Sequence, residues 1–170
     1  MFSKLIVPFT LCALSVVRMG SCQPATKATQ ANLIKVTDLG VTRIVNVRSN
    51  ALAFALGEAI VVHGGIVDHG DHGLWKAEET DVDRFVLQNI GTKGYITLGQ
   101  NDSLVLGPPV LAIKFATVAA VGGPPGSLGI TLPGGIKVWD VEFNKDSEFD
   151  GYVVLRDAHY SIQELWSFEK

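Results

Sequence analysis

Cysteine is scarce in this sequence of 170 residues, and long runs with helical periodicity are missing. Lysine and arginine number 14 against 17 acidic residues, so the chain lacks the excess of positive charge that nucleic-acid binding requires. Charged residues make up only 18% and apolar residues 47%, which excludes a coiled coil and wholesale disorder. We therefore expect one folded domain that does not bind nucleic acid.

The N-terminus has the composition of a secretory signal. Lys4 precedes a thirteen-residue apolar run over 5–17, and small residues follow up to Cys22. A run of this length is too short for a bilayer core about 30 Å thick, so we expect no membrane span. We predict a signal peptide over 1–22 and export to the extracellular space, with lipidation of Cys22 as the alternative to simple cleavage.

Removal of the signal changes the chemistry available to the chain. It takes away Lys4 and Arg18 and no acidic residue, so the net charge moves from −3 to −5. It also takes away Cys12 and Cys22, the only cysteines, which excludes a disulfide, a thiol nucleophile and a thiolate metal site. Asn101, in the sequon Asn-Asp-Ser of a polar turn, is a candidate N-glycosylation site.

Short apolar runs separated by Gly, Asn, Asp and Pro predict an all-β domain over 41–170. Residues 23–40 lack such a pattern, and we predict a flexible segment there. Because no window keeps a helical apolar stripe free of Gly and Pro, we expect essentially no helix outside the signal. Twelve runs are present, beginning near Thr42, Ala51, Ala59, Leu74, Arg84, Tyr95, Ser103, Ala112, Leu128, Lys137, Tyr152 and Leu165.

The runs recur in blocks of four. Segment 45–54 resembles segment 88–97 at a constant offset of 43, and segment 130–139 is a looser third copy. Four strands repeated three times predict a β-trefoil, because a propeller needs more blades and a sandwich has no reason for threefold recurrence. A β-sandwich with accidental similarities between its strands is the alternative.

Each block closes on a strand with a large aromatic residue. These residues are Trp75, Phe115 and Trp166. In a trefoil they would meet near the threefold axis, where aromatic side chains bury a large apolar area. We predict that all three belong to the core and not to a ligand site.

Four segments of the domain carry motifs of a known group of proteins. Segment 64–78 (GGIVDHGDHGLWKAE) and segment 163–169 (QELWSFE), the latter with one extra residue between Gln and Leu, are similar to the block endings of fungal ricin-B-like trefoil proteins. Segment 85–98 (FVLQNIGTKGYITL) resembles a strand pair of the same group, and 130–140 (ITLPGGIKVWD) resembles the third-block opening of basidiomycete β-trefoil serine-protease inhibitors. The resemblance covers residues 40–170 and implies the trefoil fold, with protease inhibitors as the closest group and fungal lectins as the alternative.

The sequence departs from the sugar-binding ricin-B pattern in two blocks. Gly-Leu-Trp at 73–75 and Lys-Phe at 114–115 replace the Gln-x-Trp endings. The resemblance therefore does not imply three equivalent sugar sites.

Motifs for catalysis and metal binding are weak. His69 and His72, in the cluster Asp-His-Gly-Asp-His, are candidate metal ligands, but the cluster lies in a glycine-flanked turn with no distant third ligand. A solvated turn is the preferred interpretation, and we predict no metal or other cofactor. Segment 125–129 lacks the first glycine of a nucleophile elbow. We expect no enzymatic activity.

The remaining function is binding through loops, which a stiff barrel presents in number. Arg48, Lys93 and Lys145 stand in polar turns and are candidate contacts for a trypsin-like protease, whose pocket accepts Arg or Lys. A solvated basic turn is the alternative for each. The sequence thus predicts a secreted monomer that inhibits an extracellular serine-type peptidase, with a glycan-binding lectin of degenerate repeats as the alternative.

Overall fold

The computed structural model describes residues 35–65, 67–120, 122–147, 150–159 and 161–170, so the predicted signal over 1–22 lies outside the described residues. This part of the chain forms twelve strands and five short 3-10 helices. The strands are β1 (Val41–Asn46), β2 (Ala51–Leu56), β3 (Ala59–His63), β4 (Trp75–Asp81), β5 (Arg84–Asn89), β6 (Tyr95–Leu98), β7 (Leu104–Gly107), β8 (Ala116–Ala119), β9 (Leu128–Thr131), β10 (Lys137–Phe143), β11 (Gly151–Asp157) and β12 (Leu165–Glu169).

The 3-10 helices are single turns between strands: η1 (Val36–Leu39), η2 (Gly70–Gly73), η3 (Gln100–Asp102), η4 (Pro109–Leu111) and η5 (Ile162–Glu164). The sequence prediction of an all-β domain without substantial helix is confirmed for the described residues. None of the helices in this part of the chain is long and apolar enough to cross a membrane.

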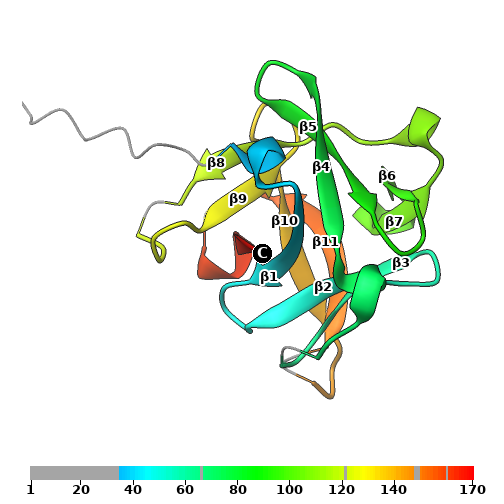
Figure 1. Ribbon diagram of the computed structural model, residues 1–170. Helices are drawn as coiled ribbons and strands as arrows, with labels where there is room; N and C mark the ends of the chain where they lie inside the picture. The colour runs from blue at the N-terminus through cyan, green and yellow to red at the C-terminus, as the bar shows by residue number, and fades with distance from the viewer. Residues whose placement is uncertain (1–34, 66, 121, 148–149, 160) are drawn as a thin grey trace, which may run out of the picture. The chain divides into compact units, whose positions relative to one another are not determined.

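Six strands close into a barrel. Antiparallel pairs join β1 to β4, β4 to β5, β8 to β9, β9 to β12 and β12 to β1, and a bridge between Phe85 and Phe115 links β5 to β8 (Figure 1). The hairpins β2–β3, β6–β7 and β10–β11 pair with one another beside the barrel, since β3 joins both β7 and β11. This is the β-trefoil that the threefold repeat predicted.

The register repeats at the spacing seen in the sequence. The strand pairs that lead from the barrel into each hairpin are Val45 with Leu52, Gln88 with Tyr95, and Thr131 with Val138, and each pair follows its predecessor by 43 positions. The third block therefore keeps the offset that its sequence obscured. The sequence of the third block looks different because it has a Pro-Gly-Gly turn, in which Gly134 and Gly135 have positive φ values of 101° and 72°. This turn has the same length as the turns of the other two repeats but different residues.

The predicted core aromatics are confirmed. Trp75, Phe115 and Trp166 are each 0% exposed. Trp139 is also 0% exposed and stands edge-on to both Phe115 and Trp166, at 5.5 Å between ring centroids in each pair. Edge-to-face aromatic pairs of this kind add stability beyond the buried area.

Three equivalent carbonyl groups surround this core. The Trp75 indole donates to the carbonyl of Ala53 at 2.9 Å, and the Trp166 indole donates to the carbonyl of Trp139 at 3.3 Å. Phe115 has no indole, and there the backbone N–H of Ile113 donates to the carbonyl of Ile96 at 2.9 Å. The second repeat thus satisfies the same buried acceptor with a different donor. This bond precedes the strand, and β8 begins at Ala116, later than the sequence pattern predicted.

Two buried asparagines fix the turns after β1 and β5. Asn46 donates to the carbonyl of Gln163 at 2.9 Å and accepts from the backbone N–H of Ser49 at 3.1 Å. Asn89, 43 positions later, donates to the carbonyl of His72 at 2.8 Å and accepts from the backbone N–H of Thr92 at 3.0 Å. Each asparagine therefore connects its own turn to the segment that precedes a neighbouring barrel strand, which is β12 for Asn46 and β4 for Asn89.

The folded domain begins before residue 41. Val36 in η1 is 4% exposed and belongs to the hydrophobic core. Lys35 forms an ion pair with Glu79 of β4 at 2.9 Å. The end of the segment predicted to be flexible, residues 35–40, therefore includes one apolar side chain that reaches the core.

Candidate functional site

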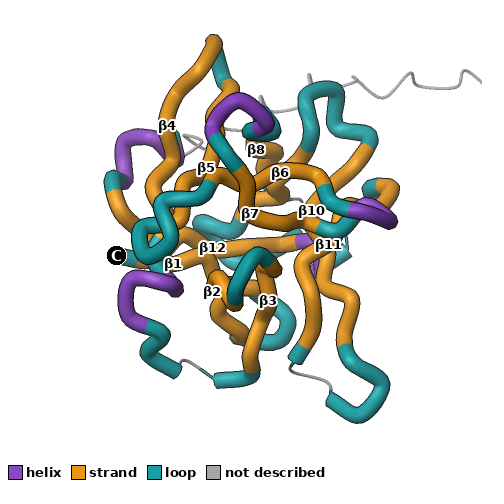
Figure 2. The backbone as a smooth tube through the Cα atoms, turned by 90° about the vertical axis from the view of Figure 1, so that its right-hand side faces the viewer, coloured by secondary structure: helices purple, strands orange, loops and turns teal. Residues whose placement is uncertain are grey.

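The β1–β2 turn and the β10–β11 connection enclose an open cleft of about 450 Å³, which we call the loop cleft. One aromatic ring lies among polar and charged side chains, and the lining residues are Arg48, Phe143, Asn144, Lys145, Asp146 and Ser147. Figure 2 shows the β10–β11 connection at the lower end of the molecule, away from the β4–β5 turn at the top. The cleft therefore offers hydrogen-bond donors and acceptors around a small apolar surface.

Arg48 and Phe143 form one wall of the loop cleft. The guanidinium carbon of Arg48 lies 5.9 Å from the centroid of the Phe143 ring, within the range of a cation–π contact. Arg48 is exposed, whereas Phe143 is half-buried and packs against the core. The ring thus holds an otherwise mobile basic side chain beside the cleft.

A carboxylate on β10 pairs with Arg156 and also interacts electrostatically with Arg48. The Asp140 side chain is 14% exposed, accepts the backbone N–H of Val141 at 2.8 Å and lies 3.5 Å from Nε of Arg156. Burial raises the pKa of Asp140, while the Val141 N–H and the positive charges of Arg156 and Arg48 act in the opposite direction. Asp140 is therefore placed to attract both guanidinium groups.

A hydrogen bond from Ser147 connects the loop cleft to a carboxylate that belongs to a group of three rings. We call Phe54, His63, His69 and Asp150 the histidine cluster. The carboxylate of Asp150 lies 2.6 Å from Nδ1 of His63 and accepts the Ser147 hydroxyl at 3.0 Å. The backbone N–H of Gly64, with smaller contributions from Ser147 and His63, lowers the pKa of Asp150. Asp150 therefore connects the β10–β11 connection to the segment that follows β3.

His69 packs flat on Phe54. Their ring centroids are 3.6 Å apart with an interplanar angle of 7°, and His63 stands edge-on to His69 at 6.1 Å. Nε2 of His69 is buried and has no hydrogen-bond partner among the described residues. Burial lowers the pKa of His69, and the neighbouring His63 acts in the same direction. The stacked imidazole is thus favoured in its neutral form.

The structure brings two of the three predicted protease contacts together. Arg48 and Lys145 line the same loop cleft, although they belong to different repeats. Lys93 lies in the β5–β6 turn with a φ of 61°, and its backbone N–H donates to the carbonyl of Asn89. Lys93 is therefore exposed but lies outside the loop cleft.

The other predicted site residues are spread over separate turns. His72 is exposed in η2, and its carbonyl accepts the amide of Asn89. Within the described ranges, no group of three or more His, Cys, Asp or Glu side chains is arranged to hold a metal ion. Asn101 is exposed in η3 with a φ of 54°, so its side chain is accessible. The glycosylation of Asn101 stays a prediction.

Sequence reasoning missed Phe143 and Asp150. Phe143 ends a strand whose alternation suggested an ordinary sheet residue, and only its contact with Arg48 marks it. Asp150 meets His63 because β11 pairs with β3, where Gly151 lies opposite Val62. The strand pairing expected of a trefoil was the one signal that could have found the Asp150 contact.

Comparisons with known proteins identify the fold. The sequence matches no family model and no curated protein. A ricin B-like lectin from Macrolepiota procera, solved in complex with lactose, is similar with a TM-score of 0.65 and 14% identity, over 76% of this chain and 94% of that chain. The agglutinin of Rhizoctonia solani gives 0.60 and 20%, over 77% and 94%. A designed 3-fold symmetric protein, ThreeFoil, gives 0.60 and 13%, over 77% and 99%.

These likenesses place the chain among β-trefoil proteins. Two of the three similar structures are described as a lectin or an agglutinin, and none of the three as a protease inhibitor. At identities of 20% and below, the agreement concerns the path of the backbone and not the ligand.

Proposed function

We propose that this protein binds carbohydrate without chemical turnover, through the loop cleft. The observation that carries the proposal is the composition of that cleft, in which the Phe143 ring lies beside an amide, a carboxylate and two cations. A sugar ring has apolar C–H faces and a rim of hydroxyl groups. Phe143 can pack against such a face, while Asn144 and Asp146 can bind neighbouring hydroxyls.

The distribution of polar groups supports binding at one place only. The histidine cluster and the loop cleft use residues of the first and third repeats. In the second repeat, the segment after β7, which corresponds to the β3–β4 segment that carries His69, leads into Pro108 and Pro109, which lack a backbone donor. The fold is also one that a lactose-bound lectin adopts. We therefore propose a lectin with a single glycan site of this kind.

Glycan-array binding followed by calorimetry tests the proposal. We expect saturable binding of at least one glycan, and we expect Asp146→Ala to weaken it about tenfold or more, since a charge-assisted hydrogen bond is worth about 1.5–3 kcal/mol. Lys145→Gln and Lys93→Gln form a matched pair of exposed loop lysines. Only Lys145→Gln should change glycan affinity, because Lys93 lies outside the cleft.

A protease-inhibition assay with Arg48→Ala and Lys145→Gln decides between glycan binding and the alternative, peptidase inhibition. If the purified chain binds no glycan on the array, and instead inhibits a trypsin-like protease in a manner that Arg48→Ala or Lys145→Gln abolishes, the protein is a peptidase inhibitor. Equal glycan affinity in all loop variants would likewise exclude the loop cleft as the binding site.

The proposal includes the extracellular compartment. It is supported by the apolar run over 5–17, which has the length of a signal peptide. Intact mass analysis of the protein recovered from culture medium should give a chain that begins at Gln23. A lipid attached to Cys22, or retention of the full chain in the cell, would contradict secretion by a cleaved signal.

A further inference from the structure

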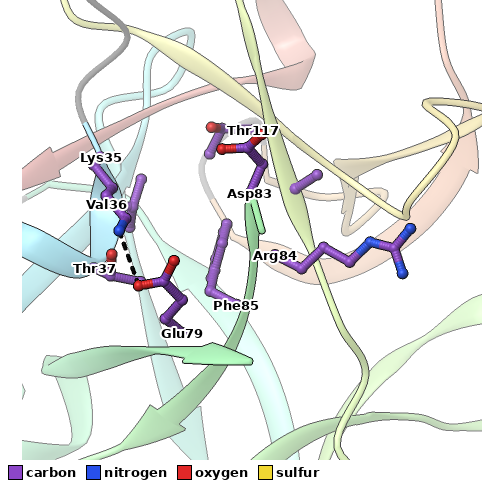
Figure 3. Close-up of a pocket in the computed structure, with 9 residues that line it drawn as sticks. Lys35, Val36, Thr37, Glu79, Asp83, Arg84, Phe85 and Thr117 are labelled. Carbon is purple, nitrogen blue, oxygen red and sulfur yellow. Dashed lines mark hydrogen bonds and ion pairs between the residues drawn. The ribbon is translucent and has the colours of Figure 1, made fainter. Parts of the chain in front are cut away.

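A second cavity lies near the β4–β5 turn, away from the loop cleft. It encloses about 470 Å³ between η1, the β4–β5 hairpin and β8, and we call it the η1 cavity. Its volume falls within the range of small-molecule sites, about 300–1,000 Å³. Its lining residues are Lys35, Val36, Thr37, Glu79, Asp83, Arg84, Phe85, Ala116 and Thr117. Figure 3 shows Phe85 between a wall made by Lys35, Thr37 and Glu79 and a wall made by Asp83 and Thr117.

The inner part of the η1 cavity is apolar. Phe85 is 5% exposed and Val36 is 4% exposed, and both belong to the main hydrophobic core. Ala116 adds a small side chain from β8 to the lining. These residues are fixed by core packing, so the base of the cavity is formed before any ligand arrives.

Negative charge exceeds positive charge around the opening. Nζ of Lys35 is bound to the Glu79 carboxylate at 2.9 Å, and the nearby carboxylates of Asp38 and Asp83 also act on Lys35. Asp83 makes no ion pair within the described part of the chain. Figure 3 shows the Arg84 side chain extending away from the space above Phe85. The Asp83 carboxylate is thus left without a paired cation.

Thr37 also lines this space, and its hydroxyl oxygen is buried beneath the surface of the cavity. Oγ1 of Thr37 is buried and has no hydrogen-bond partner among the described residues. Buried polar atoms are nearly always hydrogen-bonded, and each exception asks for an explanation. The Asp83 carboxylate, by contrast, is exposed and can accept hydrogen bonds from a ligand with a donor group.

We propose that the η1 cavity binds a small organic cation, an ammonium group carried on an apolar body. The apolar body packs against Phe85 and Val36. The ammonium group, with several N–H donors, lies between the carboxylates of Asp83 and Glu79 and within reach of the Phe85 ring face. An anion is disfavoured, because the one cation that faces the cavity, Lys35, is already paired. This site is separate from the proposed glycan site.

Titration of the purified chain with 2-phenylethylamine at pH 7, followed by ¹H–¹⁵N NMR, tests the proposal. We expect saturable shifts at the amides of 35–37, 83–85 and 116–117. The anion 3-phenylpropanoate has a similar apolar body and should cause no saturable shift. If the anion binds as well as the amine, or if neither binds, the proposal is wrong.

Two variants of one hairpin provide matched controls. Asp83→Asn removes the unpaired carboxylate and keeps a residue type that tolerates the φ of 58° at this position, so we expect the chain to fold and the amine affinity to fall tenfold or more. Asp81→Asn makes the same change of net charge in the same hairpin, outside the cavity, and should leave the affinity within twofold. Equal losses in both variants would show general attraction by surface charge and overturn the site. Glycan binding should be unchanged in Asp83→Asn, which separates this result from the proposed function.

Discussion

The three repeats are alike in the hydrophobic core and differ in the loops around it. Inside, the carbonyls of Ala53, Ile96 and Trp139 stand 43 positions apart, and each accepts one hydrogen bond from the strand block that closes its repeat. Outside, the first and third repeats together contribute the histidine cluster, and the β10–β11 connection of the third contributes most of the loop cleft. Closing a barrel requires equivalent registers, whereas loops have no such requirement. Positions that keep the same hydrogen bond in all three repeats therefore serve the fold, whereas the loops that differ between repeats are the places where a ligand can be recognised.

The largest expected effect tests the equivalence of the interior. Trp166→Ala should lower the free energy of unfolding by about 3–5 kcal/mol, because it leaves a cavity beside Trp139. Trp166→Phe imitates the second repeat but leaves the Trp139 carbonyl without a donor, so it should cost about 1–3 kcal/mol. Urea denaturation measures both. If Trp166→Phe is as stable as the parent, the hydrogen bond to the Trp139 carbonyl contributes nothing.

A smaller loss is expected at the asparagine turns. Asn46→Ala and Asn89→Ala each leave buried backbone groups unpaired and should each cost about 2–3 kcal/mol. Ser49→Ala and Thr92→Ala are the controls, since each removes one side-chain bond to the asparagine, and each should cost about 0.5–1.5 kcal/mol. Thr92→Ala also removes the bond that the Thr92 hydroxyl accepts from the Gly94 N–H, so its cost should lie at the upper end of this range. Unequal losses at Asn46 and Asn89 would break the equivalence of the first two repeats.

A pH-dependent loss should arise outside the barrel, at His69. The pKa of His69 is lowered from its ordinary value of 6.5 in the folded state, so the unfolded chain binds a proton more readily. Stability is therefore full above pH 6.5 and falls as the pH decreases from 6.5 toward the folded pKa. His69→Phe keeps the stacked ring on Phe54, cannot take a charge, and should remove this dependence in thermal melts between pH 7 and 5. His72→Gln should leave the dependence in place.

The smallest effect compares two threonines. Thr37→Val removes a buried hydroxyl that has no partner among the described residues, and should raise the free energy of unfolding by about 0.5–1 kcal/mol. Thr97→Val removes a buried hydroxyl that donates to the carbonyl of Val105 at 3.3 Å, and should lower it by about 0.5–1.5 kcal/mol. The opposite signs are measurable by urea denaturation. A loss of stability in Thr37→Val would show that its hydroxyl is satisfied.

Much of the fold could be predicted because it depends on periodic features. The offset of 43 located the first two repeats, and recurring aromatics located Trp75, Phe115 and Trp166 in the core. The third repeat was less visible, since Leu132 stands where Asn46 and Asn89 stand, and a Pro-Gly-Gly turn replaces the asparagine turn. The same strand register is thus reached with an asparagine turn in two repeats and with a Pro-Gly-Gly turn in the third. Only the asparagine turn gives a sequence pattern that recurs.

The candidate site was predictable only in part. Exposed basic turns indicated Arg48 and Lys145 as loop residues, but nothing local to either shows that they share a cleft. Their meeting depends on how the β10–β11 connection lies against the β1–β2 turn. The contact between Asp150 and His63 joins segments 87 positions apart and depends on the pairing of β11 with β3. Contacts of this kind are set by tertiary structure, and sequence patterns carry no direct signal for them.

The residues Ala53, Ile96 and Trp139 have a consequence for how this fold could be built again. They occupy one position in three successive repeats and differ greatly in size, yet all are 0% exposed. Trp139 packs edge-on against Phe115 and Trp166, a contact that a residue as small as Ala53 cannot make. A chain made of three copies of the first repeat would lack this indole in its core, and a chain made of three copies of the third would add two more indoles. Any symmetric version of this protein must therefore choose a side chain of intermediate size at this position, such as the isoleucine of the second repeat.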